Sequence, residues 1–204
     1  MKKPPHVMEI FLQPGDCWFG DERTRIRTLL GSCVAITLWH PQRRIGGMCH
    51  FMLPSRSRPA GAAADGRYAD EAMEVLLREI HQAGTAPREF EAKLFGGGRM
   101  FHHPYCDGKP CYAMQVHDRN VSAGQSLVAC HGFRLKAEHL GGQGHRQVIF
   151  DIWSGHVWMK HTPLPAALRC KASVLHGRPE GTDTPSGGGE RSESGRFSLS
   201  EGWA

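Results

Sequence analysis

The feature that most constrains the fold of this chain is a pair of extended segments on either side of a short turn. In Val34–Trp39, apolar side chains occur at every second position, which is the period of a strand with one buried face. The next four residues, His40–Arg43, include Pro41, and proline cannot continue a strand ladder. Because Ile45–Phe51 then resumes an extended pattern, we predict a β-hairpin.

The predicted hairpin brings a cysteine near a histidine. If the strands pair around the turn at His40–Arg43, the numbers of paired residues sum to about 83 or 84, so Cys33 lies opposite His50 or one step from it. Directly opposed Cβ atoms are about 5 Å apart, which is close enough for a thiol to pass its proton to an imidazole. A free cysteine has a pKa of about 8.5, so a neighbouring base would activate Cys33 as a nucleophile.

Two small residues precede the cysteine. Gly31 and Ser32 would let a substrate carbonyl approach the backbone, whose N–H groups can stabilise an oxyanion. Ser32 is equally consistent with a hydrogen-bonding helper and with a residue kept only for its size. The alternative for the pair itself is structural, with Cys33 as a small buried apolar residue and His50 as a hydrogen-bonded strand histidine.

The rest of the pattern predicts a mixture of helices and strands. Tyr68–Gln82 has apolar residues at helical spacing and acidic residues in its first turn, and a second, weaker helix is predicted over Val121–Cys130. The loop Pro54–Gly66 follows the histidine strand and is expected to line the substrate entrance. Together the elements predict an α/β, single-domain layered sandwich of mostly antiparallel strands with two main helices. Further strands are predicted at Glu91–Phe95, Phe133–Ala137, Gln147–Trp153 and His156–Lys160.

The hairpin and several later segments match one known family. The strings TLLGSCVAITLWHP, from Thr28, and IGGMCHFMLP, from Ile45, resemble the signature of the chemoreceptor glutamine deamidase (CheD) family. The similarity runs from about Met8 to Lys160, with the motifs in the same order. The further matching segments are Phe11–Asp16, Lys93–Gly98, Arg119–Val121, Gly141–Arg146, Phe150, Asp151, Gly155 and Lys160.

The resemblance implies a fold, an activity and a set of site residues. The fold is related to that of cysteine-histidine deamidase toxins, and the activity is hydrolysis of the side-chain amides of particular glutamines in bacterial chemoreceptors. Cys33 would form a thioester with the substrate while His50 moves the proton. The family also uses a threonine ahead of the cysteine, and Thr28 is its counterpart, one residue nearer than in better-known members. Neither a metal nor an organic cofactor is implied.

The resemblance also implies partners. These are the cytoplasmic helices of methyl-accepting chemoreceptors. Two alternatives remain: an interaction module that binds a chemotaxis phosphatase of the CheC type, and a receptor methylesterase, because a thioester forms from an ester as well as from an amide. The cysteine-histidine pair favours an enzyme, since an adaptor has no physical need for it.

Composition divides the chain into two parts. Residues 1–165 have a globular texture and are predicted to form the deamidase catalytic domain, whereas half of residues 177–204 are Gly, Ser or Pro. A segment of that composition cannot bury enough apolar area to offset its ordering entropy. We therefore predict that residues 166–204 are a linker and a disordered tail.

The lengths of the apolar runs and the distribution of charge restrict where the protein is expected to be located and what it is expected to bind. The first residues contain no apolar run typical of a secretory signal, and no run approaches the ~20 residues needed to span a bilayer, so we expect a cytoplasmic protein without membrane insertion. The formal net charge is +5, from basic residues that are dispersed and not interleaved with aromatic residues. Nucleic acid is therefore not an expected partner.

The seven cysteines are an odd number, and in a reducing compartment we expect thiols and no disulfide framework. The segment His102–Cys111 combines two histidines with two cysteines, which are ligand types that zinc prefers. Its spacing is loose and two prolines constrain it. An ordinary loop is the main interpretation, and a structural metal is the alternative.

Overall fold

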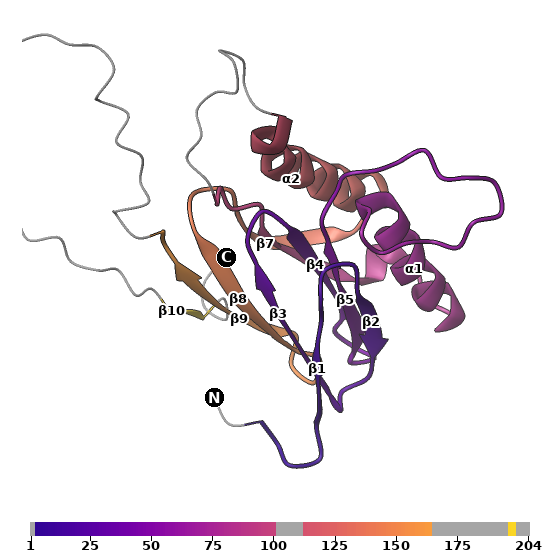
Figure 1. Cartoon of the computed structure of the whole chain (residues 1–204). Coiled ribbons are helices and arrows are strands. Elements are labelled where there is room, and N and C mark those ends of the chain that lie inside the picture. Colours follow the sequence, from indigo (N-terminus) through magenta and orange to yellow (C-terminus); the bar gives the residue numbers. More distant parts are fainter. Residues whose placement is uncertain (1–2, 101–111, 165–195, 199–204) are drawn as a thin grey trace, which may run out of the picture.

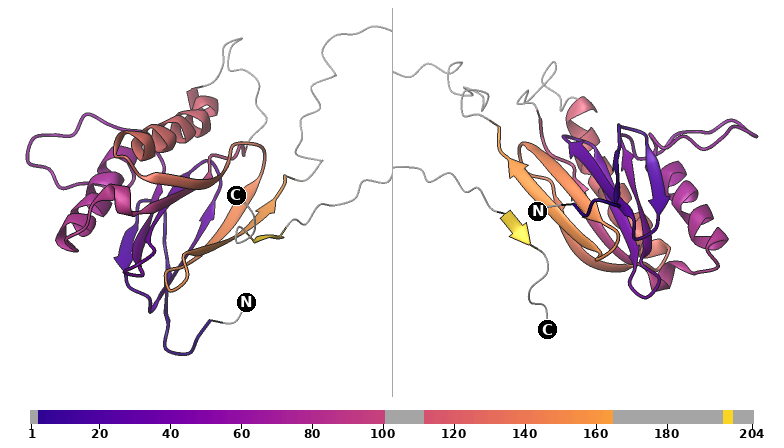
Figure 2. Two further views of the ribbon diagram at one scale, coloured as in Figure 1. Left: turned by 180° about the vertical axis from the view of Figure 1, so that it is seen from behind. Right: turned by 90° about the horizontal axis from the view of Figure 1, so that it is seen from below.

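The computed structural model describes residues 3–100, 112–164 and 196–198, in which two β-sheets and a pair of helices form three layers (Figure 1). Helices α1 (Ala69–Gln82) and α2 (Tyr112–Cys130) cover one face of the second sheet, which is therefore the middle layer (Figure 2). The first sheet contains, in spatial order, β1 (Met8–Phe11), β3 (Thr24–Leu30), β8 (His145–Asp151), β9 (His156–Thr162) and β10 (Arg196–Ser198). The second contains β2 (Cys17–Gly20), β5 (Ile45–Phe51), β4 (Val34–His40), β6 (Glu91–Gly96) and β7 (Arg134–Leu140).

The predicted α/β layered sandwich is confirmed, and most neighbouring strands are antiparallel. Among the described strands, β1 with β3 and β6 with β7 are the parallel pairs. The predicted first helix agrees with α1, for which Tyr68 is the N-cap residue. The predicted start of the second helix at Val121 was wrong, because α2 begins at Tyr112. Asn120 has the side-chain type of a helix cap, but it lies inside α2 and bonds to other elements.

The hairpin is confirmed as β4 and β5, but its first strand is buried on both faces. Val34, Ile36 and Leu38 face α1 and α2 in one apolar core. Ala35 faces the first sheet, in a second apolar core between the two sheets. The prediction of a single buried face was wrong because a strand in a middle layer is covered from both sides.

The hairpin turn lies one residue later in the chain than predicted. His40 pairs with Ile45, so the turn consists of residues 41–44 and the numbers of paired residues sum to 85. Arg44 has a φ of 53°, in the left-handed region, and its N–H donates to the carbonyl of His40 at 2.9 Å. No glycine or asparagine marks that left-handed position, so the sequence carried no signal for the later position of the turn.

Two predictions concern segments that lie wholly or mostly outside the described residues. The linker and tail over residues 166–204 are described only at β10, which pairs antiparallel with β9 (Figure 1). The remainder of that prediction, and the domain boundary at residue 165, stay predictions. The alternative metal site at His102–Cys111 lies outside the described residues.

Candidate active site

A hydrogen bond between histidine and threonine joins the two sheets. His50 in β5 and Thr28 in β3 both face the core between the sheets, and Nδ1 of His50 lies 2.8 Å from Oγ1 of Thr28. The Thr28 hydroxyl donates its one hydrogen to the carbonyl of Leu12 at 3.0 Å, so it accepts from His50. The proton of the neutral imidazole is therefore assigned to Nδ1, which leaves Nε2 with a free lone pair.

The second imidazole nitrogen is ready to act as a base. His50 is 1% exposed, and Nε2 has no hydrogen-bond partner among the described residues. Burial lowers the pKa of His50 to about 4. The imidazole is consequently neutral at pH 7 and has an unused acceptor in a protected position.

Cys33 lies on the same face of the second sheet as His50, but not opposite it. His50 pairs with Ala35, two residues after Cys33, so the prediction that Cys33 lies opposite His50 or one step from it was wrong, because the turn lies one residue later than predicted. Cys33 packs against the core between the sheets, which includes Ala35. Diagonal neighbours across antiparallel strands are about 7–8 Å apart between Cα atoms, a separation that the length of a histidine side chain spans.

Cys33 and His50 are both neutral in the free protein. Burial raises the pKa of the Cys33 thiol, and the backbone N–H of Cys33 itself acts in the opposite direction. With the pKa of His50 near 4, transfer of the thiol proton to Nε2 is unfavourable until the environment changes. The Cys33 thiol is therefore not a standing thiolate at neutral pH, and a base would be needed to make it a nucleophile.

The loop before the cysteine is held through its carbonyl groups. Gly31 and Cys33 accept hydrogen bonds from the N–H groups of Gly98 and Gly97, at 2.8 Å and 2.7 Å. A Cβ on Gly96 would lie 2.2 Å from the Cys33 carbonyl oxygen, so only glycine allows this approach. The glycine turn after β6 thus positions the backbone that carries the cysteine.

Asn120 holds the same loop from the helix layer. Its Nδ2 donates to the carbonyls of Ser32, at 3.2 Å, and Met52, at 2.7 Å. It is fully buried, on the face of α2 that also includes Gly124 and Val128. In the sequence, Asn120 stands out only as part of the family-like segment Arg119–Val121. Nothing in the sequence marked Asn120 for this role, because the helix was predicted to begin only at Val121 and the two carbonyls lie in distant segments.

Replacing Asn120 by alanine is expected to lower the free energy of unfolding by about 1–3 kcal/mol, because the carbonyls of Ser32 and Met52 lose a buried donor. Urea denaturation measures this. The isosteric Asn120→Asp variant should be at least as destabilised, since a carboxylate has no donor for either carbonyl. A stability equal to wild type in both variants would contradict the assigned role.

Arg146 supports the other side of this region. It pairs with Leu30 across β3 and β8, is 1% exposed, and donates from Nε to Nδ1 of His139 at 2.8 Å and from Nη2 to the carbonyl of Gly141. Burial lowers the pKa of Arg146 to about 10. Nη1 has no partner among the described residues, and it lies 2.9 Å from the position of a Cβ on Gly98. The guanidinium therefore lies against the glycine turn that holds the cysteine loop.

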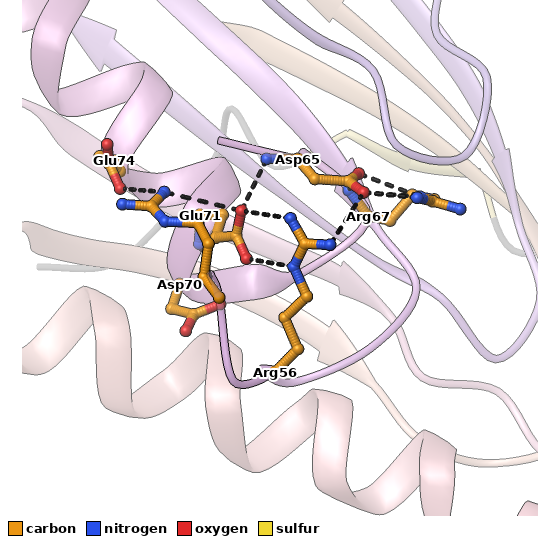
Figure 3. Close-up of polar contacts among 7 residues, drawn as sticks. Arg56, Asp65, Arg67, Asp70, Glu71 and Glu74 are labelled. Carbon is orange, nitrogen blue, oxygen red and sulfur yellow. Dashed lines mark hydrogen bonds and ion pairs between the residues drawn. The ribbon is translucent and has the colours of Figure 1, made fainter. Parts of the chain in front are cut away.

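The loop between β5 and α1 is fastened to the start of α1 by charged residues (Figure 3). Arg56 donates to both carboxylate oxygens of Glu71, at 2.8 Å and 3.2 Å, and Asp65 donates its backbone N–H to Glu71 at 2.8 Å. Arg56 lowers the pKa of Glu71 by donating these hydrogen bonds. The loop begins at Met52, which Asn120 holds, so its anchor is next to the candidate site. Its predicted place at the substrate entrance stays a prediction.

Neither a metal site nor a membrane-spanning helix is found among the described residues. Within residues 3–100, 112–164 and 196–198, no group of three His, Cys, Asp or Glu side chains is arranged to hold a metal ion. The helices of this part of the chain are too short or too polar to cross a membrane.

Comparisons with known proteins place the chain in a family. The model of the family described as CheD chemotactic sensory transduction matches residues 52–161. A relative from Pseudomonas savastanoi pv. phaseolicola is 52% identical over 170 residues, which cover 81% of this chain and 92% of the relative. The chain belongs to the CheD family. A second CheD relative, from Dechloromonas aromatica, is 52% identical over 156 residues and covers 76% of this chain and 89% of its own.

The relative from Pseudomonas savastanoi is named "Probable chemoreceptor glutamine deamidase CheD", and the one from Dechloromonas aromatica has the same name with the number 3. A more distant CheD relative from Leptospira interrogans is 33% identical over 163 residues, covering 78% of this chain and 95% of its own. The crystal structure of the hypothetical protein YfiH from Bacillus licheniformis has a TM-score of 0.38 and 12% identity, over 61% of this chain and 50% of that one. That likeness is too distant to carry an argument.

Proposed function

We propose that this protein hydrolyses the side-chain amides of specific glutamines in chemoreceptors to glutamate and ammonia. The observation that carries the proposal is the neutral His50 imidazole, whose unpartnered Nε2 and the Cys33 thiol lie on one face of the sheet. Names of CheD relatives that are about half identical to this chain support the substrate class. Membership of the family also supports a role in tuning chemotaxis signalling.

The reaction follows from the roles of the two side chains. Nε2 of His50 accepts the Cys33 proton as the sulfur attacks the amide carbon, and the same proton then leaves with the departing ammonia. The resulting thioester is cleaved by a water that gives its proton to Nε2, and that proton returns to the sulfur. The net change is amide plus water to acid plus ammonia. The N–H groups of Gly31 and Ser32, in the loop before Cys33, are the proposed support for the oxyanion.

The proposed partners are the cytoplasmic helices of methyl-accepting chemoreceptors, which places the protein in the cytoplasm. Binding of a phosphatase of the CheC type is a further proposal, which rests on the family alone. The proposed chemistry uses only side chains of this protein, water and the substrate amide, so it requires no cofactor.

Intact-mass analysis of a receptor cytoplasmic fragment tests the proposed function. Incubation with the protein should raise the mass of the fragment by about one dalton per glutamine, because OH replaces NH2. A methylesterase would instead lower the mass of a methylated fragment by one CH2 group per ester. If the receptor mass does not change while a CheC-type phosphatase binds tightly, the interaction module is the correct alternative.

Replacing Thr28 by valine is expected to lower kcat by about 5- to 30-fold, because the imidazole loses one orienting hydrogen bond worth about 1–2 kcal/mol. Thr28 acts through His50, so KM should change little. Thr28→Ser keeps the hydroxyl and should restore most of kcat. Equal losses in the valine and serine variants would argue that the methyl group of Thr28, and not its hydrogen bond, is what the site needs.

A further inference from the structure

Two cysteines face each other across β2 and β5, away from the proposed active site. Cys17 pairs directly with Cys49. Cys49 lies in the core between the second sheet and the helices, with Cys17 packed against it, whereas His50 and Cys33 face the opposite core. The pair is thus separated from the proposed catalytic cysteine by the sheet itself.

The backbone at this position suits a bond between the two sulfurs. His50, next to Cys49, accepts the N–H of Gly15 at 2.7 Å and donates to the carbonyl of Asp16 at 3.0 Å, so it occupies a hydrogen-bonded position of the ladder. Positions alternate along antiparallel strands, and the next pair, Cys17 with Cys49, is a non-hydrogen-bonded one. Cα atoms of such pairs are about 4.5 Å apart, within the range of about 4.4–6.8 Å that a disulfide spans.

The two thiols interact with each other. The side chains of Cys17 and Cys49 share a hydrogen bond, which lowers the pKa of Cys49 and raises the pKa of Cys17. Cys49 therefore loses its proton more readily than an ordinary cysteine, and Cys17 holds its proton more tightly. Cys49 is therefore the better nucleophile of the two once Cys17 has been oxidised.

One sulfur of the pair is accessible to a small molecule. Cys49 is fully buried, but Cys17 is half-buried and lines a cavity of about 220 Å³ together with side chains of β2 and α1. A water molecule occupies about 30 Å³, so a molecule slightly larger than water has room to enter. The other lining residues are Trp18, Phe19, Val75, Leu76 and Glu79.

We propose that Cys17 and Cys49 are a site of oxidation by peroxide, at which the two thiols close to a disulfide that joins β2 to β5. The sulfur of Cys17, the accessible one of the pair, attacks one oxygen of hydrogen peroxide; the O–O bond breaks, and the Cys17 proton leaves with the second oxygen as water, which gives a sulfenic acid. The sulfur of Cys49 then attacks the sulfenic sulfur and expels a second water. The two thiols supply the two electrons, and a dithiol reductant reverses the step.

The test is peptide mapping after exposure of the reduced full-length chain to hydrogen peroxide, with free thiols then blocked by N-ethylmaleimide. Trypsin cleaves after Arg23, Arg27, Arg43 and Arg44, so Cys17, Cys33 and Cys49 fall on three different peptides. We expect a linked species of the Cys17 and Cys49 peptides to dominate, two hydrogen atoms lighter than their sum, and to disappear on addition of dithiothreitol. Deamidation is not needed for this readout, so failure of the proposed function would leave it unaffected.

Variants separate this site from other thiols. Cys17→Ser should abolish the linked species, and Cys130→Ser, which removes an exposed cysteine on α2, should leave it unchanged. Cys49 is buried in the core, so Cys17 is the safer position to change. The proposal is overturned if peroxide modifies Cys33 or Cys130 while Cys17 and Cys49 are recovered as separate blocked thiols. Recovery of Cys17 as an unlinked sulfinic acid would overturn it as well.

Discussion

Replacing Cys33 by serine is expected to lower the rate of receptor deamidation by at least about 1,000-fold. A serine hydroxyl is far less acidic than a thiol, and the base available to it is weak, since the pKa of His50 is about 4. Serine therefore keeps the size of the side chain while removing the nucleophile. Intact-mass analysis of a receptor fragment over time measures the rate.

Cys130→Ser is the matched control for this prediction, because it makes the same change at an exposed position on α2. The control should deamidate at the wild-type rate, and both variants should unfold at the wild-type temperature. A second readout is alkylation by iodoacetamide, which should be slow at Cys33 at neutral pH because burial raises the pKa of its thiol. Deamidation by Cys33→Ser at more than a tenth of the wild-type rate would remove Cys33 from the mechanism.

The sequence predicted the local elements around this cysteine well, because their signals are local. Alternation in Val34–Trp39 predicted β4, helical spacing predicted α1, and the structure confirms both. The position of the hairpin turn was missed by one residue, since it depends on the left-handed φ of Arg44 and no residue type marks that conformation. The cysteine and histidine still share a face, because Ala35, the residue opposite His50, is two positions after Cys33, and side chains two positions apart in a strand point to the same side.

The contacts that complete the candidate site join elements far apart in the chain. The local sequence pattern does not predict such long-range contacts. Thr28 reaches His50 because β3 belongs to the first sheet and β5 to the second, a separation of 22 residues that only the stacking of the sheets closes. Asn120 reaches Ser32 across 88 residues. Thr28 was predicted as a site residue only from the family resemblance. The structure shows the hydrogen bond to His50 that gives Thr28 a physical role.

Replacing His50 by glutamine is expected to lower the deamidation rate by about 100- to 10,000-fold, because the base that accepts the Cys33 proton is lost. In the wild type, kcat/KM should fall on the acid side with an apparent pKa near 4, well below the usual 6.5 of histidine, since burial holds the imidazole neutral. Rates measured between pH 3.5 and 8 on a receptor fragment test this. An acid limb near 6.5 would mean that His50 is protonated more easily than its buried position allows.

The same residue makes the stability of the fold depend on pH. Between a folded-state pKa of about 4 and an unfolded value of 6.5, the unfolded chain binds more protons, so the free energy of unfolding decreases as the pH falls through this window. The shift corresponds to about 3 kcal/mol, fully present as stability above pH 6.5 and lost near pH 4. Urea denaturation at several pH values should show this loss in wild type and in His6→Gln, an exposed control, but not in His50→Gln. If His50→Gln loses as much stability as wild type over that window, other buried groups, and not the imidazole beside Thr28, take up the protons.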